Sequence, residues 1–439
     1  MKERTNHNYA LFTGIPLVGH INPLLREAEE LQRRGWRVAV ATAAEMKKHV
    51  EAESPDLPFV SIGELGPIAA SLRKDQEAAS KDASFVRGTM RIVRGLSAIW
   101  PLMFDGLTRS ICMDRPDVLV VDLFSPAGLS VAEAQAIPAV INNPDLLACL
   151  PATMLPPADW TPFLFSGRSI HAVPWHQRWS GPFVRRFAAI AASLTVERQQ
   201  NALRRSRSLP PISAHDLLAG HPILVNGVFG LEYPRPLPSS VEMVGPMLPT
   251  SVPSVSPELW EWLSNGPPVV YVNLGTLVVP PRQQLKKMIE AFETQRFRVY
   301  WIIKADQAAN LPSPISPSVR LSEWGPAPIA VLAHPNVKVF VSHCGVNSAH
   351  EAMFTETPIV GIPMFADQRD MAVRVADAGA GIWLDKAKFT PGQLQSAIER
   401  VLNDHSFAES AAKVKRRIAA AGGAPRAAEV IERAVNQAV

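Results

Sequence analysis

The sequence has few cysteines and no long apolar run. Its three cysteines, Cys112, Cys149 and Cys344, are scattered without CxxC or CxxH spacing. This spacing excludes a disulfide framework and gives no metal site. No apolar run approaches the ~18 residues that a transmembrane helix needs, and the run after the polar segment 1–8 is too short for a signal peptide. We therefore expect a cytoplasmic protein.

Several motifs of nucleotide-binding and hydrolytic enzymes are also missing. The chain has no GxSxG nucleophile elbow and no P-loop, which argues against a serine hydrolase and a kinase. Gly14 and Gly19 are spaced wrongly for GxGxxG, and Gly379 and Gly381 follow a helical pattern that is typical of a helix C-cap. A nicotinamide oxidoreductase is therefore not favoured.

Charge of either sign is sparse. Charged residues make up 19% of the chain, and its 44 Lys+Arg against 40 Asp+Glu give a net charge of +4. This even mixture predicts no nucleic-acid partner. Hydrophobic residues make up 47% of the 439 residues, with no low-complexity tract or internal repeat, so we expect a globular protein of two domains.

Short β-branched runs alternate with longer helical patterns, which predicts an α/β fold built around parallel sheets. Expected strands are 9–13, 38–42, 118–122 and 139–142 in the first half, and 269–273, 298–303, 337–342 and 359–362 in the second. Between them, residues 249–257 (PTSVPSVSP) are typical of an exposed linker. We expect a first domain over 1–248, a second over 258–410, and C-terminal helices over 411–439.

In the first domain, a histidine and an aspartate follow expected strands. Residues 9–34 suggest a strand, a loop and a helix with Asn22 as N-cap and Pro23 at its first position. His20 would precede this helix, whose partial positive charge disfavours imidazolium and would keep His20 neutral, as a base must be. Asp122 ends an apolar run and could orient the imidazole. In the alternative reading His20 satisfies a loop carbonyl and Asp122 caps a helix.

The second domain carries a denser pattern over residues 324–368. After the strand ending at 342, a turn through Gly345 leads into a predicted helix, whose backbone N–H groups, with His343, Asn347 and Ser348, would bind a diphosphate without a metal. Glu351 lies one turn further on, where its two oxygens could accept hydrogen bonds from both ribose hydroxyls. The pattern therefore indicates a nucleotide.

Other residues of this domain complete a sugar-nucleotide site. Trp324 could stack on a base while the backbone of Gly325 meets a pyrimidine edge. Asp367 and Gln368 offer a carboxylate and an amide to sugar hydroxyls, and Thr276, after an expected strand, could approach phosphate or the acceptor. Core packing of the tryptophan and a solvated turn at 367–368 are the alternatives.

Together these segments resemble the family 1 UDP-glycosyltransferases, which have a two-domain GT-B fold. The resemblance covers nearly the whole chain. It rests on the GHINP segment around His20, on 226–236 (NGVFGLEYPRP) with Val244-Gly245-Pro246, on the VVYVNLGT strand, and above all on 324–368. It implies an inverting transfer in which a histidine deprotonates the acceptor, with no covalent intermediate. It also implies that the last helix, around 426–438, packs back on the first domain.

The resemblance assigns roles residue by residue. It implies His20 as base, Asp122 as its partner, Trp324 on uracil, His343, Asn347 and Ser348 at the diphosphate, Glu351 at the ribose, and Asp367 with Gln368 at the sugar. Ala327 and Val346 depart from the plant signature, which has glutamine and tryptophan there, so a contact to the nucleotide sugar would be missing and the wall near the transferred sugar would be roomier. The Asp-Gln pair nevertheless indicates UDP-glucose as the donor, which is a co-substrate. No resident cofactor or metal is expected.

Residues 146–207 are rich in aromatic side chains, so we expect an apolar or aromatic acceptor there. The acceptor-binding residues that we expect are Phe163, Phe165, Trp175, Trp179 and Phe183. Phe183, Phe187, Ile190 and Leu194 fall at helical spacing, and the arginines among and after them are Arg185, Arg186, Arg198, Arg204, Arg205 and Arg207. Such a segment could rest on an anionic membrane surface, or pack as an ordinary helix with a solvated basic face.

Two other functions remain open. A non-catalytic auxiliary protein with this fold would not need both His20 and Asp122. A UDP-sugar epimerase would have little use for an acceptor-sized aromatic region.

Overall fold

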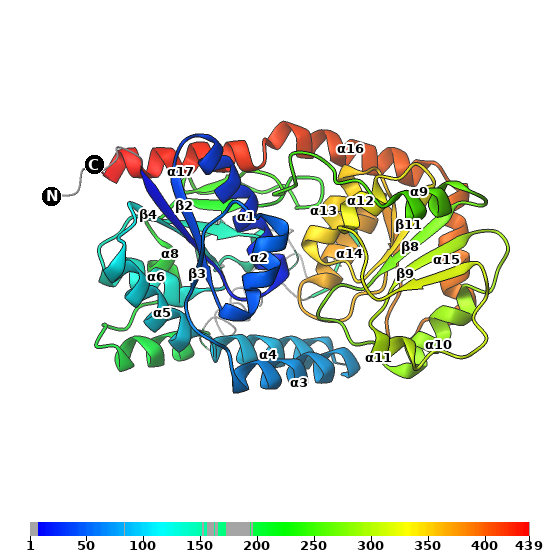
Figure 1. Cartoon of the computed structure of the whole chain (residues 1–439), viewed down its shortest axis with the longest axis horizontal. Coiled ribbons are helices and arrows are strands. Elements are labelled where there is room, and N and C mark those ends of the chain that lie inside the picture. The colour runs from blue at the N-terminus through cyan, green and yellow to red at the C-terminus, as the bar shows by residue number, and fades with distance from the viewer. Residues whose placement is uncertain are drawn as a thin grey trace.

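The computed structural model describes residues 8–82, 84–151, 153–155, 162, 166–172, 194 and 196–438. It contains two parallel β-sheets side by side, each flanked by helices (Figure 1). The first half of the chain forms the left side of Figure 1 and the second half the right side, with the final helices along the top. This is the α/β class that the alternation of strands and helices predicted.

The first sheet has seven parallel strands in the order β3-β2-β1-β4-β5-β6-β7. They are β1 (Tyr9–Thr13), β2 (Arg37–Thr42), β3 (Phe59–Ser61), β4 (Val118–Asp122), β5 (Ala139–Asn143), β6 (Ile223–Val225) and β7 (Val241–Met243). The strand order reverses between β1 and β4. The carboxyl ends of these two strands therefore lie at a topological switch point, where open parallel sheets bind ligands.

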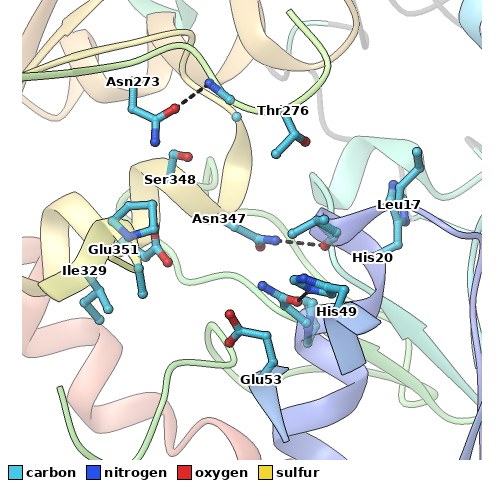
Figure 2. Close-up of a pocket in the computed structure, with 18 of the residues that line it drawn as sticks. Leu17, His20, His49, Glu53, Asn273, Thr276, Ile329, Asn347, Ser348 and Glu351 are labelled. Carbon is cyan, nitrogen blue, oxygen red and sulfur yellow. Dashed lines mark hydrogen bonds between the residues drawn. The ribbon is translucent and has the colours of Figure 1, made fainter. Parts of the chain in front are cut away.

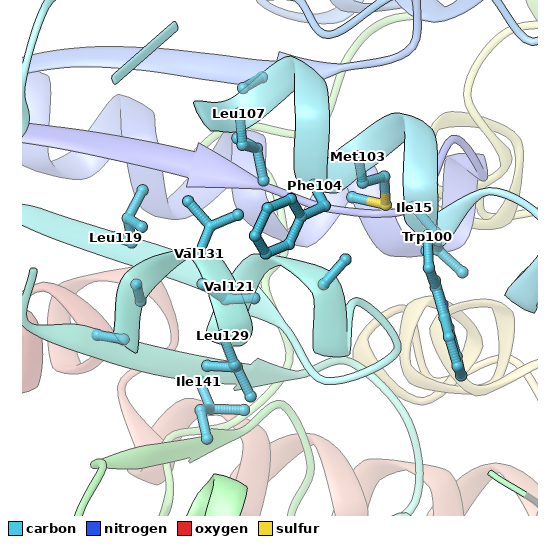
Figure 3. Packing of buried hydrophobic residues seen from close by; sticks show 14 of the residues in the cluster. Ile15, Trp100, Met103, Phe104, Leu107, Leu119, Val121, Leu129, Val131 and Ile141 are labelled. Carbon is cyan, nitrogen blue, oxygen red and sulfur yellow. The ribbon is translucent and has the colours of Figure 1, made fainter. Parts of the chain in front are cut away.

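Helices cover both faces of this sheet. They are α1 (Val18–Arg33), α2 (Lys47–Glu53), α3 (Pro67–Lys81), α4 (Phe85–Ser97), α5 (Trp100–Met113), α6 (Pro126–Ala134) and α8 (Ala214–Leu218). Figure 3 shows Trp100 and Phe104 of α5 and Leu129 of α6 in the buried cluster over β4 and β5. The other face packs against α1. Burial on both faces explains why the central strands are apolar throughout.

The second sheet has six parallel strands in the order β10-β9-β8-β11-β12-β13. They are β8 (Val269–Asn273), β9 (Arg298–Ile302), β10 (Val319–Ser322), β11 (Val337–Ser342), β12 (Ile359–Gly361) and β13 (Gly381–Trp383). Its helices are α9 (Pro257–Ser264), α10 (Arg282–Ala291), α11 (Ala305–Ala308), α12 (Pro328–Leu332), α13 (Val346–Phe354), α14 (Gln368–Asp377), α15 (Pro391–Asn403) and α16 (Ser406–Ala421). Here the switch point lies between β8 and β11.

The last helix, α17 (Ala424–Ala438), returns to the first domain. Gly422 and Gly423 separate it from α16, and both have positive φ values, 97° and 60°, which glycine adopts without a Cβ clash. Ala427 is fully buried against α1 and the first sheet, and Arg34 of α1 forms an ion pair of 2.9 Å with Glu432. The C-terminal helix thus completes the core of the first domain.

The sequence located the five- and six-residue strands and the three-residue β12, and missed the other three-residue strands. The expected strands 9–13, 118–122, 269–273 and 337–342 match β1, β4, β8 and β11 to the residue. Strands β3, β6, β7 and β13 are three residues each, too short for a periodic pattern. Residues 249–256 form neither strand nor helix, and α9 begins at Pro257 with Ser256 as its N-cap. The expected boundary after residue 410 falls inside α16.

Candidate functional site

A cavity of about 1610 Å³ lies between the two domains, lined by residues from both switch points. The first domain contributes His20 and Asp145, and the second contributes Glu351, Asp367 and Trp324. Figure 2 shows the part of this cavity where α1 and α2 face α13. Its volume exceeds the 300–1,000 Å³ or so of a typical single-ligand site, so it has room for two substrates at once.

His20 and Asp122 form a hydrogen-bonded pair at the carboxyl ends of β1 and β4. His20 Nδ1 lies 3.1 Å from Asp122 Oδ1, and the second carboxylate oxygen accepts the backbone N–H of Ile15 at 3.3 Å. Asp122 is fully buried, whereas 16% of the His20 side chain is exposed. Because a carboxylate only accepts hydrogen bonds, Nδ1 carries the proton in neutral His20 and Nε2 is left as the basic atom.

The start of α1 differs from the sequence-based expectation. The helix begins at Val18, so His20 lies in its first turn, and Pro23 lies inside the helix. The predicted N-cap Asn22 is also inside α1, where its Oδ1 lies 2.7 Å from His49 Nε2 of α2. The prediction was wrong because Asn-Pro is a common helix start, while α1 begins without a side-chain cap among the described residues.

Burial of His20 opposes its protonation, but the charge and hydrogen bond of Asp122 and the charge of Asp145 outweigh it. The net result is a His20 pKa above its ordinary value of 6.5. The helix terminus was expected to favour the neutral ring, yet the carboxylates dominate. His20 is therefore a stronger proton acceptor than an isolated imidazole and is neutral only at higher pH.

A hydrogen bond joins the two domains next to His20. Asn347 Nδ2 of α13 donates to the backbone carbonyl of Gly19 at 2.8 Å (Figure 2). This carbonyl is free of the helical ladder because its i+4 residue is Pro23, which has no N–H group. Asn347, expected at the diphosphate, thus also holds the base-bearing helix against the donor domain.

The first turn of α13 is suited to a diphosphate. Gly345 is its N-cap and has no side chain to cap the helix, so the first backbone N–H groups point towards the cavity. The ring of His343 fits between Gly275 and Gly345: a Cβ at either glycine would approach the ring to 2.7 Å or 2.5 Å. Burial lowers the pKa of His343 to about 4, against the smaller opposing effect of a hydrogen bond with the Asn273 backbone, so the ring is neutral near pH 7.

Glu351 lies one turn further along α13, as the i+4 spacing from Asn347 predicted. Burial, and to a smaller extent the charge of Glu53 on α2, raise the pKa of Glu351 to about 8. Figure 2 shows the two carboxylates on opposite sides of the cavity. Hydroxyl groups that donate hydrogen bonds to the ionised form of such a carboxyl group stabilise it, which favours binding of a ligand that supplies them.

Asp367 and Gln368 lie where α14 begins. Gln368 Oε1 accepts the backbone N–H groups of Met364 and Phe365 at 2.9 Å and 3.1 Å, so only its amide NH₂ remains to face a ligand. Burial, followed by the charge of Asp145, raises the pKa of Asp367 well above its ordinary value. The N–H of Val346 acts in the opposite direction, which places this carboxylate beside the first turn of α13.

Asp145 was missed from the sequence. It follows β5 in the first domain and lines the cavity, where its charge acts on both His20 and Asp367. Burial raises the pKa of Asp145 to about 6, against the opposing effects of the Leu146 N–H and His20. The signal that found Asp122, an acidic residue at the carboxyl end of a buried strand, would also have found Asp145, two residues beyond the end of β5.

The remaining donor candidates also line the cavity. Trp324 is 83% exposed, so the alternative of core packing is wrong for this tryptophan. A Cβ at Gly325 would come within 2.6 Å of the Ile302 side chain, so this close packing disfavours any side chain at position 325. The backbone carbonyl of Thr276 accepts a hydrogen bond from Lys304 at 3.1 Å, and the Thr276 side chain is one of the cavity-lining side chains labelled in Figure 2.

The expected acceptor residues Phe163, Phe165, Trp175, Trp179 and Phe183 lie outside the described residues. Gly167, which is close to Phe165 in the sequence, donates its backbone N–H to Asp370 of α14 at 2.6 Å, so this residue contacts the donor domain.

Two arginines of the expected basic membrane face are used inside the protein. Arg204 is fully buried and bonds Glu133 at 2.8 Å and 3.0 Å, and Arg207 bonds Asp105 at 2.6 Å. The buried Arg204 is therefore not available to a membrane surface, whereas 29% of the Arg207 side chain is exposed. Within the described part of the chain, no helix is long and apolar enough to cross a membrane, and no group of three or more His, Cys, Asp or Glu side chains could hold a metal ion.

Comparison with solved structures identifies the fold. The crystal structure of the glycotransferase of kitacinnamycin aligns with a TM-score of 0.71 over 98% of this chain and 99% of that chain, at 21% sequence identity. At this identity the likeness establishes the architecture alone. The two parallel-sheet domains are the GT-B fold.

Comparison of sequences identifies the family. The family model described as "UDP-glucoronosyl and UDP-glucosyl transferase" matches residues 106–418. A UDP-glycosyltransferase of Aspergillus ustus is 25% identical over 77% of this chain and 69% of its own length, and one of Fusarium mangiferae is 26% identical over 93% and 80%. The chain therefore belongs to the UDP-glycosyltransferase family and is a UDP-sugar-dependent glycosyltransferase.

Proposed function

We propose that this enzyme transfers a hexose, with glucose as the first candidate, from a UDP-sugar to a hydroxyl group of an apolar or aromatic small molecule. The observation that carries the proposal is His20, which is bonded to Asp122 at 3.1 Å and lines the same cavity as Glu351 and Asp367. A base and a nucleotide-sugar site that share one cavity are the two parts that glycosyl transfer requires.

The donor half of the proposal rests on the second domain. The first turn of α13, with His343 beside it, would bind the diphosphate by its backbone N–H groups and the helix dipole, so the leaving group's charge is met without a metal. Glu351 would accept the ribose hydroxyls and Trp324 would stack on uracil. Asp367 and the Gln368 amide would bind the hexose, and this carboxylate-amide pair is what favours glucose.

The acceptor half rests on the first domain. His20 Nε2 would take the proton of the acceptor hydroxyl as its oxygen attacks the anomeric carbon from the face opposite UDP. Asp122 holds the ring by Nδ1 and stabilises the imidazolium that forms. The bond to the diphosphate breaks as the new bond forms, which inverts the anomeric centre. The aromatic residues of segment 163–183 stay the predicted acceptor contacts.

The test is a transfer assay with UDP-glucose and a panel of phenols, macrolides and sterols. Mass spectrometry should detect an added hexose, NMR should show a β-linked product from the α-linked donor, and excess EDTA should leave the rate unchanged. An α-linked product would contradict inversion. Conversion of UDP-glucose to another UDP-hexose without transfer would favour the epimerase alternative, and UDP-galactose serves as the comparison donor.

A further inference from the structure

The hairpin formed by α3 and α4 belongs to the first domain but ends against the second. Figure 1 shows the two helices side by side along the lower edge, reaching toward α11, where Arg73 lies 3.5 Å from Asp306. Ala79 is fully buried in the core cluster of the second domain. Ser80 and Thr89, on the same hairpin, are 1% and 2% exposed. Their hydroxyl groups therefore lie in the contact between the domains.

Two polar side chains at this contact bind the same turn of the second domain. Thr89 Oγ1 accepts the backbone N–H of Ala366 at 3.0 Å. Lys386, which follows β13 and is 6% exposed, donates to the carbonyl of Met364 at 2.5 Å. The same ammonium group also lies 3.4 Å from the carbonyls of Ala79 and Ser80, at the end of α3. A cation is favoured there because the last carbonyls of a helix carry partial negative charge.

The turn held in this way, residues 364–366, leads directly into Asp367 and Gln368. Gln368 Oε1 accepts two of its N–H groups, and Ala366 has a positive φ of 55°. A residue with a Cβ keeps such a conformation only where its surroundings hold it. Those surroundings include Thr89, a residue of the opposite domain. The conformation that presents the sugar-binding pair thus depends on contact between the domains.

We propose that Thr89 and Lys386 are positioning residues for the donor sugar: they hold the 364–366 turn so that Asp367 and Gln368 face the hexose when the domains are in contact. The proposal rests on the assignment of Asp367 and Gln368 to the sugar under the proposed function. Through this contact the acceptor domain contributes to recognition of a sugar that it does not touch at this point.

The same hairpin offers a matched control. Ser80 Oγ accepts the backbone N–H of Val279 at 3.1 Å, in the loop after β8 that also carries Thr276. Ser80→Ala removes one hydrogen bond between the domains, as Thr89→Val does, but leaves the 364–366 turn in place. Thr89→Ser keeps the accepting oxygen and serves as the conservative variant.

The first experiment compares binding of UDP and UDP-glucose by calorimetry. Thr89→Val should weaken UDP-glucose binding by about five- to thirtyfold, as expected when a buried N–H loses its acceptor, and change UDP binding by less than about twofold. Lys386→Gln should give the same split from the other side of the turn if Thr89→Val does not fold. Thr89→Ser should restore wild-type binding, and Ser80→Ala should not discriminate the two ligands. Equal weakening of both ligands by Thr89→Val, or no weakening, would overturn the proposal.

A second readout is independent of which sugar the enzyme uses. Hydrogen exchange of the ligand-free protein should be faster for the amides of residues 364–368 in Thr89→Val and unchanged in Thr89→Ser and Ser80→Ala. Unchanged exchange in Thr89→Val would overturn the positioning role whatever the donor is. A wrong choice of donor would instead be visible in the wild-type protein, as UDP-glucose binding no tighter than UDP.

Discussion

Asp122 of the first domain and the cavity-lining carboxylates of the second domain lie in different electrostatic environments. In the first domain, fully buried Asp122 is bonded to His20 and to the N–H of Ile15. In the second, the pKa values of Glu351 and Asp367 are raised by burial and then by other carboxylates, Glu53 and Asp145. The first arrangement stabilises a positive charge on a ring within the protein. The second becomes favourable when a ligand supplies hydroxyl groups, so the two domains are suited to proton transfer and to sugar-nucleotide binding respectively.

The largest effect should come from His20→Ala, which removes the base and leaves the donor domain intact. Transfer should fall by about two to four orders of magnitude, the usual range for losing a general base. Binding of UDP-glucose, measured by calorimetry on the same sample, should be nearly unchanged. A parallel loss of donor binding would mean that the two sites are not separable.

Glu351→Gln tests the donor side of the comparison. The amide has one accepting oxygen in place of two charged ones, so UDP should bind about ten- to a hundredfold more weakly because charge-assisted hydrogen bonds to the ribose are lost. Uridine should lose as much affinity as UDP, which fluorescence or calorimetric titration can measure. An unchanged affinity for uridine would show that Glu351 does not bind the ribose.

Asp367→Ala should give a smaller and more selective effect. UDP-glucose should bind about tenfold more weakly, because one carboxylate contact to the sugar is lost, while UDP keeps its affinity. The measurement is the ratio of the two dissociation constants in the variant and in the wild type. Equal losses for both ligands would show that this carboxylate does not act on the sugar.

The smallest expected effect is the release of part of a proton when UDP binds. The pKa of Glu351 is about 8 in the free protein, so a fraction of the molecules carry a proton on this carboxyl group at a pH just below 8. Hydrogen bonds from the ribose hydroxyls to the ionised carboxylate should expel this proton. UDP binding should therefore release part of a proton there and become tighter as the pH rises toward 8. Calorimetry in buffers of different ionisation enthalpy measures the release, and Glu351→Gln should abolish it.

The sequence predicted that most of the candidate donor residues lie together, because they are close along the chain. His343, Gly345, Asn347, Ser348 and Glu351 occupy one turn and one helix, so their mutual placement follows from helical spacing. The central strands were equally clear, since burial on both faces requires continuous apolar runs.

What the sequence did not predict depends on contacts between distant segments. Asp145 acts on Asp367 across the cavity, Asn347 bonds Gly19 across the domain boundary, and Thr89 reaches Ala366 from a hairpin. None of these pairs has a local pattern, because tertiary packing alone brings them together. The effect on the pKa of His20 was misjudged for the same reason. The start of α1 is close to His20 in the sequence, whereas Asp122 and Asp145, which raise this pKa, are more than a hundred residues away.

The most direct test of the account is the pH dependence of single-turnover transfer in the wild type and in Asp122→Asn. The neutral ring is the base and its pKa is raised, so the wild-type rate should increase with pH through a value above 6.5 and then level off. Without the charge of Asp122, burial of His20 prevails, and the increase should move to lower pH with a lower final rate. The same midpoint in both proteins would contradict the assignment of His20 as a base controlled by Asp122.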